Sequence, residues 1–191
     1  VEFLGKKFQV IYKENKPVET GRALGANTTH SVDGLIVREM KRRCNYNPLR
    51  VDAVRRALRG EGSDYIVGSK EDDEMVEILW NLYLESGYLS ARILQHLNVN
   101  NIHMVQASEI TELLDSLPPK PFDILTVHDC FRCLPNYGND LRIQYANQLY
   151  LIARSELLSF LLSQLVGQKI VINKINPTMY KDIKDTNYAI C

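Results

Sequence analysis

The chain has 191 residues, of which 45% are hydrophobic, and its 23 Lys and Arg residues balance its 23 Asp and Glu residues. This length is enough for one large domain or two small ones with an apolar core. The neutral total excludes a histone-like basic protein and a disordered acidic tail, but it does not exclude nucleic-acid binding, which depends on local patches. Such patches exist: residues 38–59 have eight basic and two acidic side chains, whereas residues 61–77 have seven acidic ones and one lysine.

Cysteine content and hydropathy indicate the redox compartment of the chain and whether a membrane is among its partners. Four cysteines in a chain of this length do not suggest a disulfide framework, so a reducing compartment is expected. The longest apolar run, residues 157–165, is interrupted by polar side chains and is shorter than the ~20 residues of a membrane helix, so no membrane is expected among the partners. The sequence has no signal peptide and begins with Val1 in a strand-like pattern, which suggests a fragment, a processed product or one piece of a larger assembly.

The first part of the chain predicts a strand pair followed by a helix. Apolar and polar side chains alternate in residues 3–20 around an Asn-Lys-Pro turn, and residues 21–28 are predicted to form a loop. The helix is expected over residues 29–43, with Thr28 or Thr29 as its N-cap. Gly34 weakens this helix by about 1 kcal/mol relative to Ala, but it would let another chain or a nucleic acid approach closely. The apolar face of the helix consists of Val32, Leu35, Ile36 and Met40.

The middle segment, residues 44–121, is predicted to be mainly helical. Helices are expected over residues 49–59, 70–86, 88–97 and 108–117, and a short strand is expected over residues 102–105. The helix over residues 70–86 begins with an acidic turn, which suits the helix dipole. Its expected apolar face consists of Met75, Ile78, Leu79, Leu82 and Tyr83. Trp80 and Tyr83 are interpreted as core or interface residues rather than a base-stacking platform, because no basic residues lie between them.

The last part of the chain predicts a β-hairpin and a long helix. Strand-like runs over residues 122–127 and 130–134 flank His128 and Asp129, so the simplest interpretation is a tight hairpin with these two residues at its bend. A long helix is expected over residues 139–166, ended by Gly167, and the tail that follows is polar. The core-facing residues of this helix are expected to be Leu141, Tyr145, Leu149, Ile152 and Leu157.

Asp129 is the residue whose position most clearly suggests chemistry. A hairpin bend holds the backbone rigid and exposes the carboxylate oxygens, which are the hard ligands that Mg²⁺ prefers. Mg²⁺ usually takes one or two carboxylates together with substrate phosphates, and two such ions can activate an attacking hydroxyl and stabilise a leaving pyrophosphate. The alternative from pattern alone is that Asp129 is an ordinary turn residue and His128 a capping or core histidine.

Four stretches resemble the single-subunit DNA-directed RNA polymerases, the family of phage-type and mitochondrial enzymes. Residues 126–131 read TVHDCF and resemble the family's third polymerase motif, and residues 27–34 read NTTHSVDG and resemble the start of a palm helix that lies along the template–product duplex. Residues 3–8 resemble the strand that leads into this helix, and residues 182–191 resemble the family's acidic-aromatic C-terminus, which returns toward the catalytic centre. The four stretches also occur in the family's order. Family-A DNA polymerases share the hairpin aspartate but typically follow His-Asp with Glu, where this chain has Cys130.

The resemblance implies a fold class and a division of the chain. The expected class is α+β: a palm-like element of a right-hand polymerase, in which a β-hairpin with the catalytic aspartate packs on long helices. Residues 1–43 would form a strand pair and a duplex-facing helix, and residues 122–191 the catalytic hairpin, the long helix and the C-terminal tail. The middle segment is not covered by the resemblance, so we expect it to be a mainly helical insertion.

The activity implied by the resemblance is that of a nucleotidyltransferase, in which an RNA 3′ hydroxyl attacks the α-phosphate of an NTP and releases pyrophosphate. Asp129 would be the catalytic residue that binds two Mg²⁺ ions, and His128 would lie beside it in the active site. The residues expected to bind the duplex are His30, Ser31, Asp33, Arg38, Lys41 and Arg42.

The family's other two motifs are missing from the chain. They supply a second metal-binding Asp and a helix with an Arg and a Lys, so these groups are expected from preceding sequence or a partner chain, and this chain alone should not polymerise. The implied partners are the DNA template, the RNA product, NTPs and the remainder of the polymerase. A phage-encoded member would act in the host cytoplasm or the virion, and the alternative location is the mitochondrion.

Competing interpretations remain for function and for individual features. The alternative function is a non-catalytic nucleic-acid-binding or assembly subunit of a transcription complex that keeps the palm shape. Cys130 and Cys133 suggest a zinc or redox pair, but there is no second pair, and residues three apart on a strand face opposite sides, so we favour no such role. The basic residues of 50–59 are interpreted as a solvated face paired with the acidic 61–77 stretch, and residues 71–74 as the acidic start of a helix. Residues 38–43 are equally consistent with phosphate contacts and with a solvated face.

Overall fold

The structure, a computed structural model, describes residues 21–62, 68–127 and 129–186, together with Gln9 and strands β1 (Glu2–Phe3) and β2 (Lys6–Lys7). The described part is mostly helical with two small antiparallel sheets, β1–β2 and β3–β4, which confirms the α+β class at a coarse level. The strand pair expected over residues 3–20 is described only at Phe3, at Lys6–Lys7 and at Gln9, which is not in a strand, and the rest of it lies outside the described residues. The remaining elements are α1 (Arg22–Cys44), α2 (Pro48–Leu58), α3 (Lys70–Ser86), η1 (Ala91–Gln95), η2 (Ile102–Met104), α4 (Ala107–Asp115), β3 (Leu125–Val127), β4 (Cys130–Arg132), η3 (Pro135–Tyr137), α5 (Gly138–Arg154), α6 (Leu157–Val166) and α7 (Met179–Asp185).

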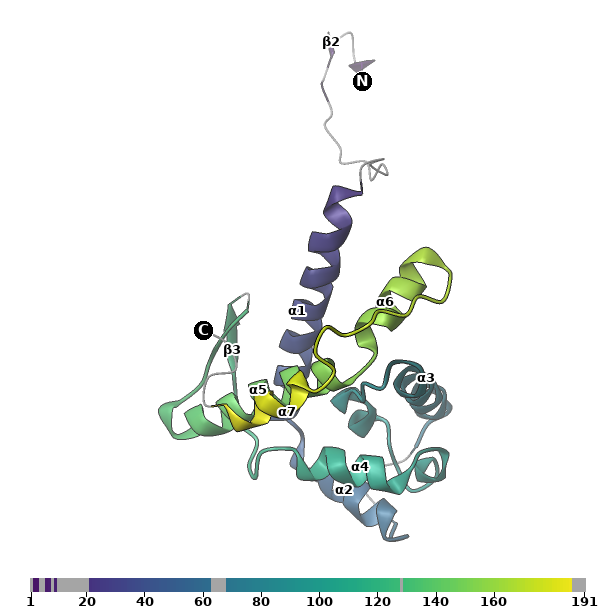
Figure 1. Ribbon diagram of the computed structural model, residues 1–191. Helices are drawn as coiled ribbons and strands as arrows, with labels where there is room; N and C mark the ends of the chain where they lie inside the picture. The colour runs from purple at the N-terminus through teal and green to yellow at the C-terminus, as the bar shows by residue number, and fades with distance from the viewer. Residues whose placement is uncertain are drawn as a thin grey trace.

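Helix α1 is longer than expected and stands partly free of the body. It begins after Gly21, so the loop predicted over residues 21–28 is wrong, and neither Thr28 nor Thr29 is the N-cap. Both threonines lie inside the helix, where their hydroxyls donate to the carbonyls of Leu24 (2.8 Å) and Gly25 (3.1 Å). This bond to the carbonyl four residues earlier lets polar β-branched residues remain helical. The N-terminal half of α1 projects from the body, and only its C-terminal half is buried (Figure 1).

One apolar core, here called the hairpin core, joins α1 to the hairpin and α5. Its buried members are Ile36, Met40, Cys44 and Phe122, and the partly buried residues packed against them are Val32, Ile124, Phe131, Cys133, Tyr137, Leu141, Tyr145, Leu149 and Ile152. Phe122 stacks on Tyr137 with ring centroids 4.7 Å apart and planes within 5°. The apolar faces predicted for the first helix and for the helix after the hairpin are therefore confirmed, since most of their members lie in this core.

A second core lies entirely within the middle segment, between residues 51 and 117. Its buried members are Val54, Val76, Trp80, Ala91, Ile93, Leu94, Leu97, Ile110, Leu113 and Leu114. The core position expected for Trp80 is confirmed, but the apolar face predicted for α3 is partly wrong, because Ile78 and Leu82 are 52% and 41% exposed. Helix α3 instead turns Trp80 toward η1 and α4, where the largest apolar side chain of the helix is removed from water. The strand predicted over residues 102–105 is also wrong, because these residues form the 3₁₀ turn η2.

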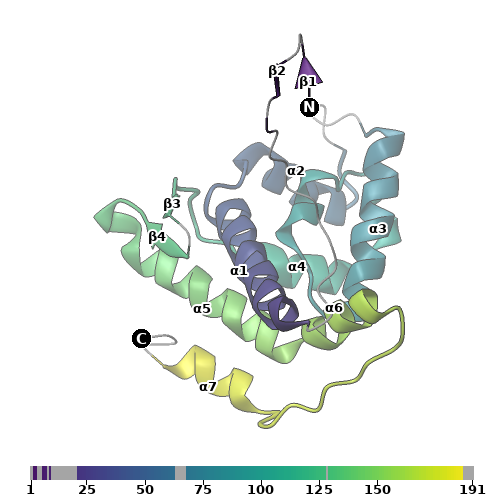
Figure 2. The same ribbon diagram turned by 90° about the horizontal axis from the view of Figure 1, so that it is seen from above.

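The chain leaves the hairpin core at the start of the middle segment and returns to it beside the point where it left. The Phe122 amide donates to the Cys44 carbonyl at 2.7 Å, and the Asn45 side chain donates to Asp123 at 2.7 Å. Seen from above, α1 lies between α5 on one side and the helices of the middle segment on the other (Figure 2). The hairpin core and the core of the middle segment therefore lie on either side of α1.

The long helix predicted over residues 139–166 is two helices, α5 and α6, that meet at a bend of 60°. The break lies at Ser155 and Glu156, where the Glu156 amide donates to the Ser86 carbonyl at the end of α3 (2.8 Å) instead of continuing the helix. Gly167 ends α6 in the left-handed conformation, as predicted. Among the described helices, none by itself is long and apolar enough to cross a membrane; only the bent pair 135–154 and 157–166, taken together, has sufficient length and apolar composition.

A short C-terminal helix, α7, lies along α5 and was not predicted from the polar tail (Figure 1). The Tyr180 ring meets the Tyr150 ring edge-on at 5.7 Å, and the Lys184 ammonium lies 3.8 Å from the centre of the Tyr150 ring. A cation over an aromatic face gains about 0.5–1 kcal/mol at an exposed site, which helps a helix of seven residues to stay docked.

Candidate active site at the hairpin turn

Strands β3 and β4 form the tight hairpin that the sequence predicts. Val127 pairs with Cys130 and Thr126 with Phe131, so the strands are joined by a tight turn in which Asp129 lies. Asp129 is exposed at this turn and forms no hydrogen bond or ion pair with any described residue. His128, the predicted neighbour of Asp129 in the active site, lies outside the described residues. The hairpin therefore presents one carboxylate to solvent, and no described residue occupies its acceptor positions.

The base of the hairpin is anchored on α5 while its outer face is open. Phe131 lies on the inner face, where its ring meets the Tyr145 ring at a centroid distance of 5.5 Å and an angle of 49°. This tilted arrangement falls within the range that aromatic pairs prefer. On the outer face Leu125 and Val127 are 61% and 53% exposed. The hairpin is thus packed on α5 at its inner face, through Phe131 of β4, and exposed at its outer face, through Leu125 and Val127 of β3.

Helix α1 and the hairpin both influence the electrostatics of one residue of α5, Tyr145. Burial raises the pKa of the Tyr145 hydroxyl, and the nearby carboxylates of Asp129 and Asp33 raise that pKa further. Asp33 is exposed on α1, and the sequence placed it among the duplex-binding residues. Two carboxylates from stretches almost a hundred positions apart in the chain therefore act electrostatically on one phenol hydroxyl.

The exposed face of α1 holds most of the other predicted nucleic-acid-binding residues. His30, Gly34, Arg38 and Lys41 are spaced by three or four residues and so follow one side of the helix. His30, Arg38 and Lys41 are exposed, and neither cation forms an ion pair within the described part of the chain. Ser31 is exposed beside them and donates its hydroxyl to the Asn27 carbonyl at 2.8 Å. We call His30, Gly34, Arg38 and Lys41 the polar stripe of α1.

Arg42, also predicted to bind nucleic acid, points elsewhere. Its guanidinium is 23% exposed and forms an ion pair with Glu39, which is 1% exposed. Glu39 also accepts hydrogen bonds from the Ser90 hydroxyl (2.6 Å) and the Ala91 amide (2.8 Å) at the start of η1. Arg42 thus helps to fasten α1 to the middle segment, and it is a weaker candidate for phosphate contact than Arg38 or Lys41.

Arg43 is a buried residue whose role the sequence did not reveal. It is fully buried, donates to the Gln144 side chain at 2.8 Å and to the Ser116 carbonyl at 3.2 Å, and burial lowers the pKa of its guanidinium. The sequence contains a signal for the burial of Arg43: it follows Met40 by three positions and Ile36 by seven, which is the spacing of the buried face of the helix. Its charge belongs to the junction between α1, α5 and the middle segment and is not available to a ligand.

The basic stretch from 50 to 59 is largely neutralised by its neighbours, which supports the interpretation as a solvated face. Arg55 pairs with Asp115 at 3.0 Å, Arg56 with Asp52 at 2.8 Å, and Arg59 with Glu61 at 2.9 Å. Of these partners, only Glu61 belongs to the acidic stretch that was expected to pair with these arginines.

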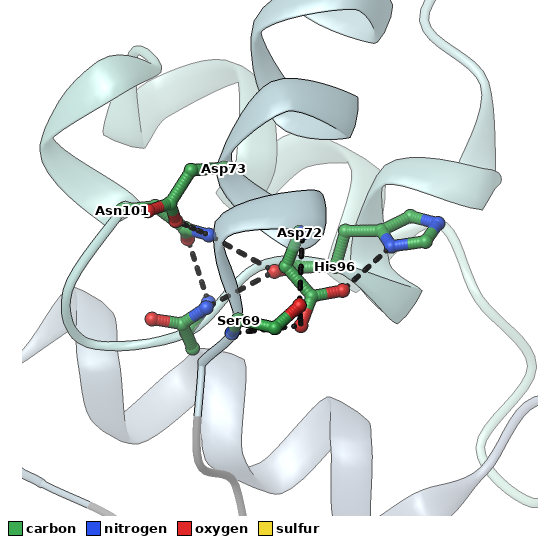
Figure 3. A network of polar contacts seen from close by, with 6 residues as sticks. Ser69, Asp72, Asp73, His96 and Asn101 are labelled. Atoms are coloured by element: carbon green, nitrogen blue, oxygen red, sulfur yellow. Dashed lines mark hydrogen bonds and ion pairs between the residues drawn. The ribbon is translucent and has the colours of Figure 1, made fainter.

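The acidic start of α3 is used for helix capping (Figure 3). The Ser69 hydroxyl accepts from the Asp72 amide, and the Asp72 carboxylate accepts from the Ser69 amide, which forms a capping box. Asp72 also bonds His96 at 2.8 Å, and the Asn101 amide group donates to Asp73 at 2.9 Å. Although Ser, Asp and His meet here, the aspartate lies between the other two, so His96 is not placed to take a proton from Ser69 as in a hydrolase triad.

The described part of the chain offers few ligands for a metal ion. No group of three or more His, Cys, Asp or Glu residues there is arranged to hold a metal ion. Cys130 is exposed, Cys133 is partly buried in the hairpin core, and both are free, as is the buried Cys44. The donor set at the turn, one exposed and unpaired carboxylate, fits Mg²⁺, which is commonly held by one or two carboxylates plus substrate phosphates.

Comparison with known proteins adds no relative. No protein-family model matches the chain, and no curated protein matches it significantly. The functional argument therefore depends on the residues and their geometry.

Proposed function

We propose that this chain is the C-terminal palm portion of a single-subunit DNA-directed RNA polymerase, which adds NTPs to an RNA 3′ end together with motifs supplied by preceding sequence or a partner chain. The observation that supports this most directly is the meeting of two motif-bearing segments. The hairpin of the TVHDCF stretch and the helix of the NTTHSVDG stretch share the hairpin core, although the middle segment separates them in sequence. Burial and, after it, the carboxylates of these segments, Asp129 and Asp33, raise the pKa of the Tyr145 hydroxyl.

Asp129 is the proposed catalytic residue. Its position on a tight turn between paired strands fixes the carboxylate, and its exposure lets substrate phosphates approach. Mg²⁺ held there would lower the pKa of the RNA 3′ hydroxyl and neutralise charge on the phosphates and the leaving pyrophosphate. The contribution of this chain is positioning, since a rigid, pre-oriented carboxylate needs no reorganisation during the reaction.

The polar stripe of α1 is the proposed duplex-binding surface. Arg38 and Lys41 are exposed cations without ion pairs in the part of the chain that the structure describes, and α1 projects from the body on the side of the hairpin (Figure 1). Such cations bind phosphates without regard to base sequence and release counterions. The duplex would follow α1 and place its RNA end at Asp129.

The remainder of the polymerase is proposed to cover the outer face of the hairpin. A two-stranded sheet by itself is marginal in water, and here Leu125 and Val127 are largely exposed on its open side. A further strand or helix from preceding sequence or a partner chain would bury them and bring the missing aspartate next to Asp129. The middle segment has its own core, and the chain leaves and re-enters the hairpin core at adjacent residues, Cys44 and Phe122, which supports its interpretation as an insertion into the palm.

The experiment that tests this function is Asp129→Asn in the complete polymerase, with nucleotide addition on a primed template as the readout. We expect near-total loss of nucleotide addition with an unchanged unfolding temperature, because Asp129 is exposed and has no partner among the described residues. Glu77→Gln is the matched control, because Glu77 on α3 is also exposed and its carboxylate pairs with no described residue. Near-normal nucleotide addition by the Asp129 variant would contradict the proposal. Loss of complex assembly without loss of chemistry would favour the non-catalytic alternative.

A further inference from the structure

One side of α3 is apolar and largely exposed. Met75, Ile78 and Leu82 follow one another at steps of three and four residues, so they lie on the same side of the helix, and we call them the apolar seam of α3. We propose that this seam and the glutamates beside it form a docking surface for a basic amphipathic helix of a partner protein. The inference does not rest on the proposed function, because α3 belongs to the middle segment, which contains none of the polymerase-like motifs.

The apolar seam is separate from the face by which α3 packs on the rest of the middle segment. That face includes Val76 and Trp80, which are buried in the core of the middle segment. Ile78 and Leu82 are 52% and 41% exposed, and α3 lies at the outer edge of the molecule (Figure 2). The sequence pattern predicted both residues to be in the core. An apolar helix face that its own chain does not bury is typical of a surface that a partner covers.

Carboxylates border the apolar seam. Glu71 and Glu85 continue its spacing at the two ends, and Glu74 lies four residues before Ile78, on the same side of the helix. All three glutamates are exposed, and none of them forms a hydrogen bond or an ion pair with a described residue. The surface therefore combines apolar side chains at helical spacing with negative charge that the described part of the chain does not neutralise.

The charge of this surface decides which kind of partner it fits. Nucleic acids and anionic membranes would be repelled, and a second copy of the chain would place the same glutamates opposite one another. A helix with apolar side chains at the same spacing and Lys or Arg beside them would bury Ile78 and Leu82 and neutralise the glutamates. In such interfaces the buried apolar anchors provide most of the affinity, and the charged rim sets the orientation and the rate of association.

The test uses this chain and two synthetic helical peptides of about three heptads, both with Leu at the core positions. One peptide has Lys beside the leucines and the other has Glu at the same places. The Kd of each labelled peptide is measured by fluorescence anisotropy. We expect the Lys peptide to bind and the Glu peptide not to bind. Added salt should weaken binding of the Lys peptide, because the glutamates that it meets are exposed to solvent.

Substitutions in the apolar seam locate the binding surface. Ile78→Ala and Leu82→Ala are compared with the matched control Leu84→Ala. Leu84 is on the same helix and is 63% exposed, but its position two residues after Leu82 turns it to another side. We expect the Kd of the Lys peptide to rise at least 10-fold in each seam variant and to stay unchanged in the control. Alanine favours the helix, and the unfolding temperature of each variant is measured in parallel.

A change of charge tests the glutamates independently of the apolar side chains. Glu74→Lys is compared with Glu112→Lys, which makes the same change on the exposed surface of α4. We expect Glu74→Lys to weaken binding of the Lys peptide about 5-fold, and Glu112→Lys to leave it unchanged. Glu74 is exposed, so this pair of variants decides the question even if an alanine variant unfolds.

Each result decides the inference. Binding of the Lys peptide that the seam variants and Glu74→Lys weaken, and that both controls retain, would support it. Failure of the Lys peptide to bind at millimolar concentration would overturn it, as would equal binding of the two peptides or equal losses in the Leu82 and Leu84 variants. A dimer of the chain that Leu82→Ala abolishes, detected by analytical ultracentrifugation, would also overturn it, because a second copy would then occupy the surface.

Discussion

Glu39 is the residue through which α1 is fastened to the middle segment, and its removal is the most demanding test of the structure. The Glu39 carboxylate is 1% exposed and accepts hydrogen bonds from Arg42, from the Ser90 hydroxyl at 2.6 Å and from the Ala91 amide at 2.8 Å. All three donors depend on it: Arg42 for its counter-charge, and Ser90 and Ala91 for their place at the start of η1. We therefore consider Glu39→Ala and the milder Glu39→Gln.

The magnitude follows from the groups that would be left without partners. A buried amide such as that of Ala91 costs about 1–3 kcal/mol when its acceptor is removed, and each hydrogen bond to a charged group contributes about 1.5–3 kcal/mol. Arg42 adds less, because its guanidinium is 23% exposed and water can solvate it. We expect Glu39→Ala to lower the free energy of unfolding by about 3–5 kcal/mol, as for other broken buried pairs. Glu39→Gln keeps one acceptor and should cost about 1–3 kcal/mol.

The assay is urea-induced unfolding of this chain, followed by fluorescence. Trp80 is the only tryptophan and lies in the core of the middle segment, so its emission reports on that segment directly. Far-UV circular dichroism in parallel reports on all helices, α1 included. The exposed Glu77→Gln serves as control and should change the free energy of unfolding by less than about 0.5 kcal/mol. A loss below about 1 kcal/mol in Glu39→Ala would refute the reasoning, because the carboxylate would then not hold the contacts that the structure gives it.

Two further predictions use other features of the structure. Burial opposes ionisation of Asp72, but the hydrogen bonds of its carboxylate with His96 and Ser69 outweigh burial and lower its pKa. The ionised carboxylate therefore stabilises the fold above the unfolded pKa of about 3.9. This stabilisation is lost as the pH falls through the lower pKa of the folded state. Asp72→Asn should therefore flatten the fall in urea midpoint between pH 6 and pH 2, and an unaltered pH profile would count against this assignment. Lys41→Gln should reduce the slope of log affinity against log salt for an RNA–DNA duplex by about 1, measured by fluorescence anisotropy with the complete form of the polymerase proposed above. The ion-paired Arg56→Gln should leave that slope unchanged, and equal slopes in both variants would contradict the polar stripe as a phosphate-binding surface.

The bounds of a helix could be predicted from the sequence where residues at its own ends cap it. The bounds of α3 agree with the prediction, because Ser69 and Asp72 form a capping box and Gly87 adopts the left-handed conformation. The start of α1 was missed because Gly, Asn and Thr are poor helix formers, and their helical state here depends on hydroxyl bonds along the helix. The break between α5 and α6 had no local signal, since it depends on the carbonyl of Ser86 at the end of another helix.

The candidate site was predictable in its chemistry but not in its surroundings. Asp129 and the tight turn follow from the motif and from the flanking strand-like runs. Arg42 and Arg43 appeared as two more charges in a basic stretch, and only the packing of α1 against η1 and α5 shows that both serve the junction. Tyr145 was expected to face a core, and the structure adds that its ring contacts Phe131 of the hairpin, a contact between elements that local sequence does not reveal.

The hydrogen bond between the Phe122 amide and the Cys44 carbonyl has a consequence for the order in which the chain folds. The hairpin core joins residues 32–44 to residues 122–152, so its contacts span a long stretch of chain, and such contacts form slowly because the loop between them must first close. The core of the middle segment uses only residues from that loop. Once it has formed, Cys44 and Phe122 are held side by side, and α1 and the hairpin meet as if they were neighbours in sequence. We therefore expect the middle segment to fold first and to bring the β3–β4 hairpin onto α1.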